Sequence, residues 1–173
     1  MNFGRSKAGL AGTLALCALI SGASAQDTAP HEIGTVYYAD GAGFKALEKE
    51  PAPASGHSKF SAKLKGAHAA VRLAAGGAQK FRVCSADPTR YKLYVLRSTK
   101  KSRDVTITKI NIWIGGAKSV LSNSEIPITI EPAENGCFTM APKERLTDGE
   151  YSISPVGEEY AFTFGVGPEK RPK

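Results

Sequence analysis

The feature that most constrains this chain is an alternation of apolar and polar residues with a period of two, which runs from Ile33 almost to the C-terminus. It is clear in Val71-Arg72-Leu73, Lys80-Phe81-Arg82-Val83-Cys84 and Ile126-Pro127-Ile128-Thr129-Ile130-Glu131. Successive side chains of a strand point to opposite faces of the sheet, so this period predicts strands with one buried face. Helix signals are scarce, because only residues 46–50 and 143–146 could form a helical turn and neither carries periodic apolar positions. The chain is therefore predicted to be all-β.

Turn signals divide the alternating sequence into short strands. They include Gly76-Gly77, Gly115-Gly116, Asn135-Gly136 and Asp148-Gly149. Short strands at this spacing are typical of an antiparallel β-sandwich, with a small open barrel as the alternative. A chain of 173 residues is long enough to bury one sizeable core. The strands are predicted at residues 35–39, 44–48, 60–64, 69–73, 80–84, 91–97, 104–114, 126–130, 137–141, 150–154 and 159–166, with an extended surface loop at 49–58.

Two of these strands carry further information. Along residues 104–114 the apolar positions change face, so a bulge or a change of sheet is expected near Thr108 and Lys109. Trp113 in the same strand is expected in the core, with an exposed ligand-stacking role as the alternative. The last strand is predicted to be an integral core strand, because one face carries Tyr160, Phe162, Phe164 and Val166.

The first 25 residues have the layout of a secretory signal peptide. Arg5 and Lys7 give a basic start, residues 10–20 form an apolar run, and Ala23-Ser24-Ala25 fits the cleavage rule. The apolar run is too short for a membrane span, and Leu16 before Cys17 disfavours a lipoprotein signal. We therefore expect an exported protein, periplasmic or extracellular, with no transmembrane segment after cleavage. The expected organisation is a signal peptide at 1–25, a single β-sandwich domain at 26–166 and a disordered basic tail at 167–173.

Two cysteines remain after the predicted cleavage. Cys84 and Cys137 would then lie in a chain that passes through an oxidising compartment, which predicts a disulfide between them. Neither cysteine lies in a Cys-x-x-Cys or nucleophile signature, so a structural role is favoured over a catalytic thiol.

Few residues are spaced for catalysis or metal binding. The histidines, His31, His57 and His68, lack metal-ligand spacing. A Ser-His-Asp set can be drawn from Ser58, His57 and Asp87, but triads are defined by geometry, and a serine-rich chain yields such sets by chance. We therefore predict no catalytic residue, no cofactor and no metal site.

The most distinctive surface feature is a group of basic residues around the strand at 91–97 and the loop that follows it. Residues 98–103 are predicted to form a hairpin tip, and the candidate contacts to an anionic partner are Arg97, Lys100, Lys101 and Arg103. The alternative is a solvated loop that protects a sheet edge. Without the signal peptide the chain keeps 21 of its 23 basic residues against 16 acidic ones, a net charge of +5, which permits such attraction. Tyr91 and Tyr94 fall on opposite faces of their strand, so a stacking platform for nucleic acid is not expected.

Three stretches together resemble a loose group of uncharacterised exported bacterial all-β proteins. They are Ile33-Gly34-Thr35-Val36-Tyr37-Tyr38 with Phe44-Lys45-Ala46-Leu47-Glu48, then residues 66–71, then residues 141–151 with the terminal Phe164-Gly165-Val166. The resemblance implies an all-β, sandwich-like fold and an exported setting. Its motifs are strand and turn signatures, so it transfers no site.

The expected function is that of a non-catalytic binding or envelope-associated module. Its partner would be an anionic envelope component or another protein. A small secreted hydrolase and a periplasmic enzyme inhibitor that acts through a loop are the alternatives. A buried polar cluster near His68 would favour the enzyme, whereas a protruding basic loop favours binding.

Overall fold

The computed structural model describes residues 32–41, 43–55, 59–113, 116–121 and 124–169. Strands make up 58% of the structure and helix 5%, which confirms the all-β class. The helical residues form two 3-10 turns, η1 (Pro88–Arg90) and η2 (Glu134–Gly136). No helix in the described ranges is long and apolar enough to cross a membrane. The predicted signal peptide at 1–25 and the last residues of the predicted tail, 170–173, lie outside the described residues.

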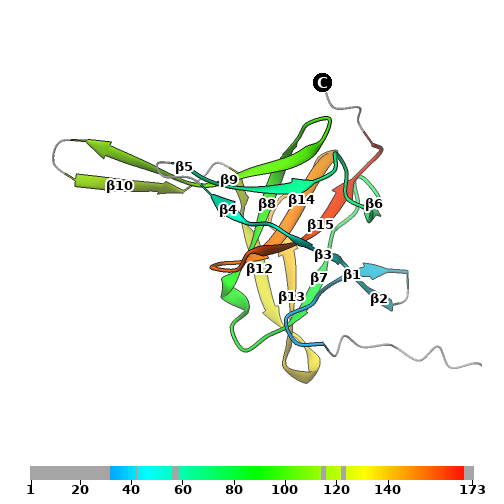
Figure 1. Cartoon of the computed structure of the whole chain (residues 1–173). Helices are drawn as coiled ribbons and strands as arrows, with labels where there is room; N and C mark the ends of the chain where they lie inside the picture. The colour runs from blue at the N-terminus through cyan, green and yellow to red at the C-terminus, as the bar shows by residue number, and fades with distance from the viewer. Residues whose placement is uncertain (1–31, 42, 56–58, 114–115, 122–123, 170–173) are drawn as a thin grey trace, which may run out of the picture.

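Five antiparallel strands form the smaller sheet (Figure 1). In spatial order they are β12 (Ile128–Pro132), β13 (Cys137–Pro142), β7 (Phe81–Cys84), β1 (Val36–Asp40) and β2 (Gly43–Ala46). A disulfide joins two of them, because Cys84 at the end of β7 and Cys137 at the start of β13 are direct register partners. Their Cα atoms lie 3.8 Å apart. The predicted disulfide is thus confirmed.

The larger sheet has ten strands. Its path runs through β3 (Glu48–Pro51), β15 (Tyr160–Val166), β14 (Gly149–Pro155), β8 (Tyr91–Ser98), β9 (Ser102–Trp113), β5 (Lys59–Lys65) and β4 (Ala54–Ser55). Three further strands pair with members of this path, namely β10 (Gly116–Leu121) with β9, β11 (Glu125–Ile126) with β8 and β6 (Arg72–Leu73) with β15. The β6–β15 pairing is parallel, whereas neighbouring strands along the path are antiparallel.

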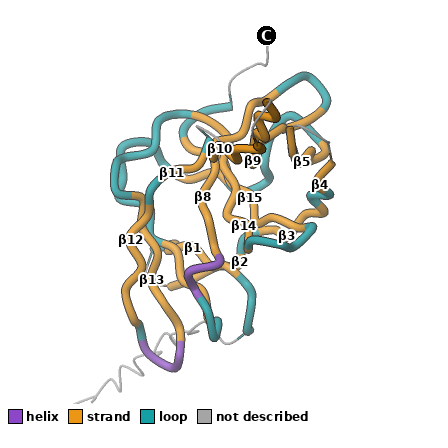
Figure 2. The backbone as a smooth tube through the Cα atoms, turned by 90° about the vertical axis from the view of Figure 1, so that its left-hand side faces the viewer, coloured by secondary structure: helices purple, strands orange, loops and turns teal. Residues whose placement is uncertain are grey.

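The larger sheet curls back on itself. β3 and β4 lie at opposite ends of its path, yet they follow each other in the chain, separated only by Ala52 and Pro53. The two edges must therefore lie close together, and the sheet forms a curled half-barrel. Figure 1 shows the smaller sheet beside it and the β9–β10 hairpin extending away from the body, and Figure 2 shows the β12–β13 hairpin from a second side. This arrangement is consistent with a sandwich or an open barrel.

Two apolar cores lie on the two faces of the curled sheet. The main core fills the space between the sheets, where Phe164 of β15 lies 4.8 Å from Phe81 of β7, measured between ring centroids. The second core lies inside the curl and contains Ala52, Ala62, Leu64, Tyr94, Leu96, Val105 and Ala161. Strand β8 serves both cores, because Tyr91 and Leu93 face the first while Tyr94 and Leu96 face the second. The expected opposite orientation of the two tyrosines is confirmed.

The last strand is buried on both faces, which exceeds the prediction of one buried face. Phe162, Phe164 and Val166 belong to the main core, and Ala161 belongs to the core inside the curl. Thr163 between them is fully buried. β15 is therefore a central strand of the fold, as predicted.

The sequence-based strand assignments need several corrections. Of the predicted strand at 69–73 only Arg72–Leu73 form a strand, β6, and the predicted strands at 44–48 and 126–130 are interrupted at Leu47 and Pro127. The described part of the predicted surface loop at 49–58 instead contributes to β3, which pairs with β15 far away in the sequence, and to β4, which forms a hairpin with the neighbouring β5. Residues 116–121 were not expected to form a strand, but they pair with β9 as β10. The predicted irregularity near Thr108 is confirmed, since the pairing of β5 with β9 shifts by one residue between Thr108 and Thr106. The side chain of Trp113 lies outside the described part of the chain.

Candidate functional site

The predicted hairpin tip is present between β8 and β9. The turn is closed by Thr99, whose N–H donates to Ser102 O at 2.8 Å and whose Oγ1 accepts from Ser102 N at 3.0 Å. The side chains of Arg97, Lys100 and Lys101 are exposed around this turn. These three predicted contact residues therefore present their charges to solvent.

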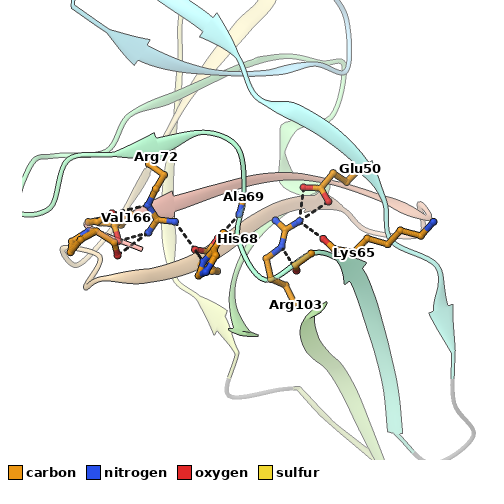
Figure 3. Close-up of polar contacts among 11 residues, drawn as sticks. Glu50, Lys65, His68, Ala69, Arg72, Arg103 and Val166 are labelled. Carbon is orange, nitrogen blue, oxygen red and sulfur yellow. Dashed lines mark hydrogen bonds and ion pairs between the residues drawn. The ribbon is translucent and has the colours of Figure 1, made fainter. Parts of the chain in front are cut away.

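Arg103, the fourth predicted contact residue, does not present its charge to solvent. Arg103 is only 2% exposed. Its side chain lies inside the curl, because the strand register places it on the same face of the sheet as Ser98 and Leu64. Its Nη2 donates to both oxygens of Glu50, at 3.0 and 2.7 Å, and to Lys65 O at 2.7 Å, while its Nε donates to Gly66 O at 3.2 Å (Figure 3). The inclusion of Arg103 in the exposed basic group is thus corrected. Its guanidinium stabilises the interior.

Two lysines that the sequence analysis missed take its place at the surface. Strand β5 pairs with β9 so that Lys63 lies opposite Asp104, which in turn lies opposite Arg97 of β8. Lys65 follows on the same face and is held near the tip, because Gly66 N donates to Lys101 O at 3.0 Å. The alternation of Ser61, Lys63 and Lys65 with Ala62 and Leu64 marked an outward polar face in the sequence, but nothing local showed which strand would lie beside it.

A groove opens between β8 and β9 beside this tip. The two strands pair only at Arg97–Asp104 and Ser98–Arg103 among the described residues; further along, β8 pairs with β11 instead, and Val95 N donates to Ser124 O at 2.8 Å. The resulting groove has a volume of about 460 Å³. We call it the basic groove. Its charged lining residues are Lys63, Arg97 and Asp104, and its hydroxyl residues are Ser55, Ser61, Thr106 and Ser124.

The cations of the basic groove and of the hairpin tip are not neutralised by ion pairs among the described residues. In the part of the chain that the structure describes, Lys63, Lys65, Arg97, Lys100 and Lys101 make no ion pair, whereas Arg72, Arg90 and Arg103 each pair with a glutamate. Asp104 lies between Lys63 and Arg97 in register, and its Oδ1 is buried without a hydrogen-bond partner among the described residues. Asp104 as a whole is partly exposed and lines the groove, so its carboxylate is placed to accept a hydrogen bond from a ligand hydroxyl there.

A second charged cluster lies inside the curl around Glu150, which is 5% exposed (Figure 3). Its Oε1 accepts from Arg72 Nη1 at 2.6 Å and lies 3.2 Å from His68 Nδ1, and its Oε2 accepts from Ala69 N at 2.8 Å. Arg72 also donates through Nε to Gly167 O at 2.8 Å, which ties down the first residue of the predicted tail. A Cβ at Gly165 would lie 2.3 Å from Arg72 Nη1, so a side chain at this position would displace the guanidinium from its present contacts. The cluster fastens the 66–73 segment to β14 and β15.

Several residues considered for catalysis prove to have structural roles or fall outside the described residues. Asp87 caps η1, since its Oδ1 accepts from Thr89 N at 3.1 Å. His31, His57 and Ser58 lie outside the described residues. No cluster of three potential ligand side chains suited to a metal ion was found among the residues that the structure describes.

Two buried tyrosines have perturbed hydroxyl groups. Burial, together with the nearby Glu125 carboxylate, raises the pKa of Tyr94 to about 12. Burial likewise raises the pKa of Tyr91, whose hydroxyl donates to Gly34 O at 3.4 Å. Both hydroxyls therefore stay protonated at neutral pH and act as neutral polar groups.

Comparisons with known proteins give no relative. No protein-family model matches the chain, and neither a curated protein nor a solved structure gave a significant match. The functional conclusion therefore depends on the geometry of this molecule alone.

Proposed function

We propose that this protein is an exported, non-catalytic binding module whose basic groove takes an anionic saccharide chain. The observation that carries the proposal is a set of five exposed cations without ion pairs among the described residues, of which Lys63 and Arg97 line the basic groove and Lys65, Lys100 and Lys101 lie at the adjoining hairpin tip. Cations that are not neutralised within the protein attract an anionic ligand over about 10 Å at 0.1 M salt. The disulfide between Cys84 and Cys137 is compatible with an exported setting.

The polar lining favours a saccharide over a simple anion. Hydroxyl side chains line the groove together with Lys63 and Arg97, and the Asp104 carboxylate between these two cations offers an acceptor. A carboxylate would repel a bare anion, but it accepts hydrogen bonds well from sugar hydroxyls. The combination therefore suits a chain that carries both negative charges and hydroxyl groups.

The proposal is tested by calorimetric titration of the purified protein with an oligogalacturonate, an anionic saccharide. We expect binding that weakens as salt is raised. The variant Arg97→Ser/Lys100→Ser/Lys101→Ser should bind about tenfold more weakly, since each exposed ion pair contributes up to about 1 kcal/mol. Asp104→Asn should also weaken binding of the saccharide.

A matched control removes the same charge elsewhere. Lys80, Lys143 and Arg145 are exposed and lie together at another shallow site. The variant Lys80→Ser/Lys143→Ser/Arg145→Ser should keep the affinity of the unmodified protein. Equal losses in both triple variants would refute the groove, and binding to phosphatidylglycerol vesicles without binding to the oligosaccharide would contradict the saccharide assignment.

One observation favours a second candidate, a small hydrolase. His68, Glu150 and Arg72 form a buried polar cluster of the kind expected for an enzyme. Against catalysis, both oxygens of Glu150 are engaged in hydrogen bonds, and the described residues include no serine or cysteine hydrogen-bonded to His68. Hydrolysis of p-nitrophenyl acetate that disappears in His68→Ala would favour the hydrolase over the binding module.

A further inference from the structure

The smaller sheet ends in an edge strand that no described strand covers. β12 is the last strand in the order of this sheet and lies at the outside of the molecule in Figure 2. On its inner side β12 pairs with β13, and Lys143 N donates to Pro127 O at 2.9 Å. Hydrogen-bonded positions alternate along an antiparallel pair, so the backbone groups of Thr129 and Glu131 also face β13.

The N–H and C=O groups of Ile128 and Ile130 therefore point away from the sheet. None of these groups is hydrogen-bonded to another described residue. Prolines border this stretch, because Pro127 precedes it and Pro132, the next outward position, has no N–H to donate. They restrict strand pairing at this edge to the residues between them, which disfavours open-ended aggregation.

This edge is complementary to the same edge of a second copy. In an antiparallel pairing centred on Thr129, Ile128 of one copy lies opposite Ile130 of the other, and each such pair exchanges two N–H···O=C hydrogen bonds. All outward groups of both isoleucines are then satisfied. The pairing also covers apolar surface, because the two isoleucine side chains are only half-buried against the main core. Glu131 comes to lie opposite Pro127, so no like charges meet.

The opposite edge of the sheet is protected against such a contact. By the same alternation, the outward backbone groups of β2 belong to Phe44 and Ala46. An equivalent pairing of two β2 strands would place Lys45 opposite the Lys45 of the second copy, and like charges directly opposite each other destabilise a sheet. In β12 the central position is the neutral Thr129.

We propose that two copies of this protein form a dimer by antiparallel pairing of their β12 strands, with Thr129 at the two-fold axis. The same surface is used by both copies, so the contact closes on itself and assembly stops at the dimer. A contact between two short strands is smaller than the about 1,200–2,000 Å² of stable interfaces, so the dimer forms at high protein concentration.

The dimer carries two basic grooves. Ser124 lines the groove, and the chain runs from it through β11 directly into β12, so each groove begins a few residues from the contact. Two linked sites bind a long saccharide chain more tightly than one site when both are engaged. This consequence rests on the proposed function, whereas the dimer itself does not.

The test combines sedimentation with amide hydrogen exchange. Sedimentation velocity of the purified protein at physiological salt, up to about 1 mM, should show a reversible monomer–dimer equilibrium. Amide exchange followed by NMR at low and high concentration locates the contact. The amides of Ile128 and Ile130 should exchange more slowly as the dimer forms, whereas those of Thr129 and Glu131, which face β13, should not change.

Charges introduced at the axis test the register. Thr129→Lys places two lysines opposite each other and should weaken dimerisation about fivefold, and Thr129→Glu should do the same. An equimolar mixture of the two variants should dimerise at least as well as the unmodified protein, because lysine then faces glutamate. Thr139→Lys is the matched control, since Thr139 lies on the same outer face but in β13, one strand away from the contact. It should leave dimerisation unchanged.

Several results would overturn the proposal. They are a monomer at every concentration, growth beyond the dimer, and amide protection in β2 rather than in β12. Equal association of the separate Thr129 variants and of their mixture would likewise contradict a contact centred on Thr129.

Discussion

Arg97 and Arg103 lie close together across the β8–β9 hairpin, yet one guanidinium is exposed and the other is buried. The difference comes from strand alternation, because Arg97 faces outward with Lys63 while Arg103 faces into the curl with Leu64. Inside, Arg103 is neutralised by Glu50, whose side chain is 14% exposed, and is bonded to two backbone carbonyls. The same residue type is thus exposed at one position, where the proposed function assigns it to ligand binding, and neutralised in the interior at the other.

Removing one partner of the buried pair should be strongly destabilising. We expect Arg103→Met to lower the free energy of unfolding by about 3–5 kcal/mol, because Glu50 is left as an uncompensated charge in the interior. Arg97→Met, the matched exposed substitution, should change it by less than about 0.5 kcal/mol. Urea denaturation followed by circular dichroism measures both values. The double variant Arg103→Met/Glu50→Gln should recover part of the loss, and equal effects of the two arginine substitutions would argue against the ion pair.

Among the strands, β15 makes contacts that link several parts of the fold. It pairs with β14 on one side and with β3 and β6 on the other, and it contributes to both cores. Strand β6 joins it only through Arg72 and Leu73, and Gly165 N donates to Val71 O at 2.8 Å. Loss of β15 would therefore remove the pairing partner of three strands and part of both cores.

Two truncated chains should distinguish the contribution of β15 to stability from that of the residues that follow it. A chain that ends after Gly157 loses Phe162, Phe164 and Val166 from the main core, and burial of such side chains contributes about 1.5–3 kcal/mol each. This loss approaches the whole stability of a domain, so the product should be aggregated or protease-sensitive. A chain that ends after Gly167 keeps β15 and the Gly167 carbonyl that Arg72 binds, and it should resist limited proteolysis like the full chain. A soluble, protease-resistant product from the shorter chain would contradict the central role of β15.

At the scale of the whole molecule, the disulfide ties together two segments that are distant in the sequence. It joins residues 53 positions apart and fixes β7 beside β13. Along the chain, β8, β9 and β10 of the larger sheet lie between these two strands. The loop closed by this bond therefore contains strands of both sheets, namely β8 to β11 of the larger sheet and β12 of the smaller one.

Removal of the disulfide should lower stability while leaving the native topology intact. We expect Cys84→Ser/Cys137→Ser to reduce the free energy of unfolding by about 4 kcal/mol, because a covalent loop of this length restricts the unfolded chain. Urea denaturation measures the change, and the unmodified protein in excess reductant should give the same midpoint as the double variant. Unaltered stability in both conditions would contradict the contribution of the bond.

The local features of this protein follow from short stretches of its sequence. The period of two predicted the strands, the turn residues predicted the β8–β9 tip, the change of face in residues 104–114 predicted the bulge, and the two cysteines predicted their bond. Each of these signals resides in a few neighbouring residues or in a single possible pairing. Tertiary pairing, in contrast, is the reason that residues 48–55 close the curl, that Lys63 and Lys65 lie beside the tip and that Arg103 faces inward. These outcomes depend on which distant strands pair and in which register, and a shift of one residue would send every side chain of a strand to the other face.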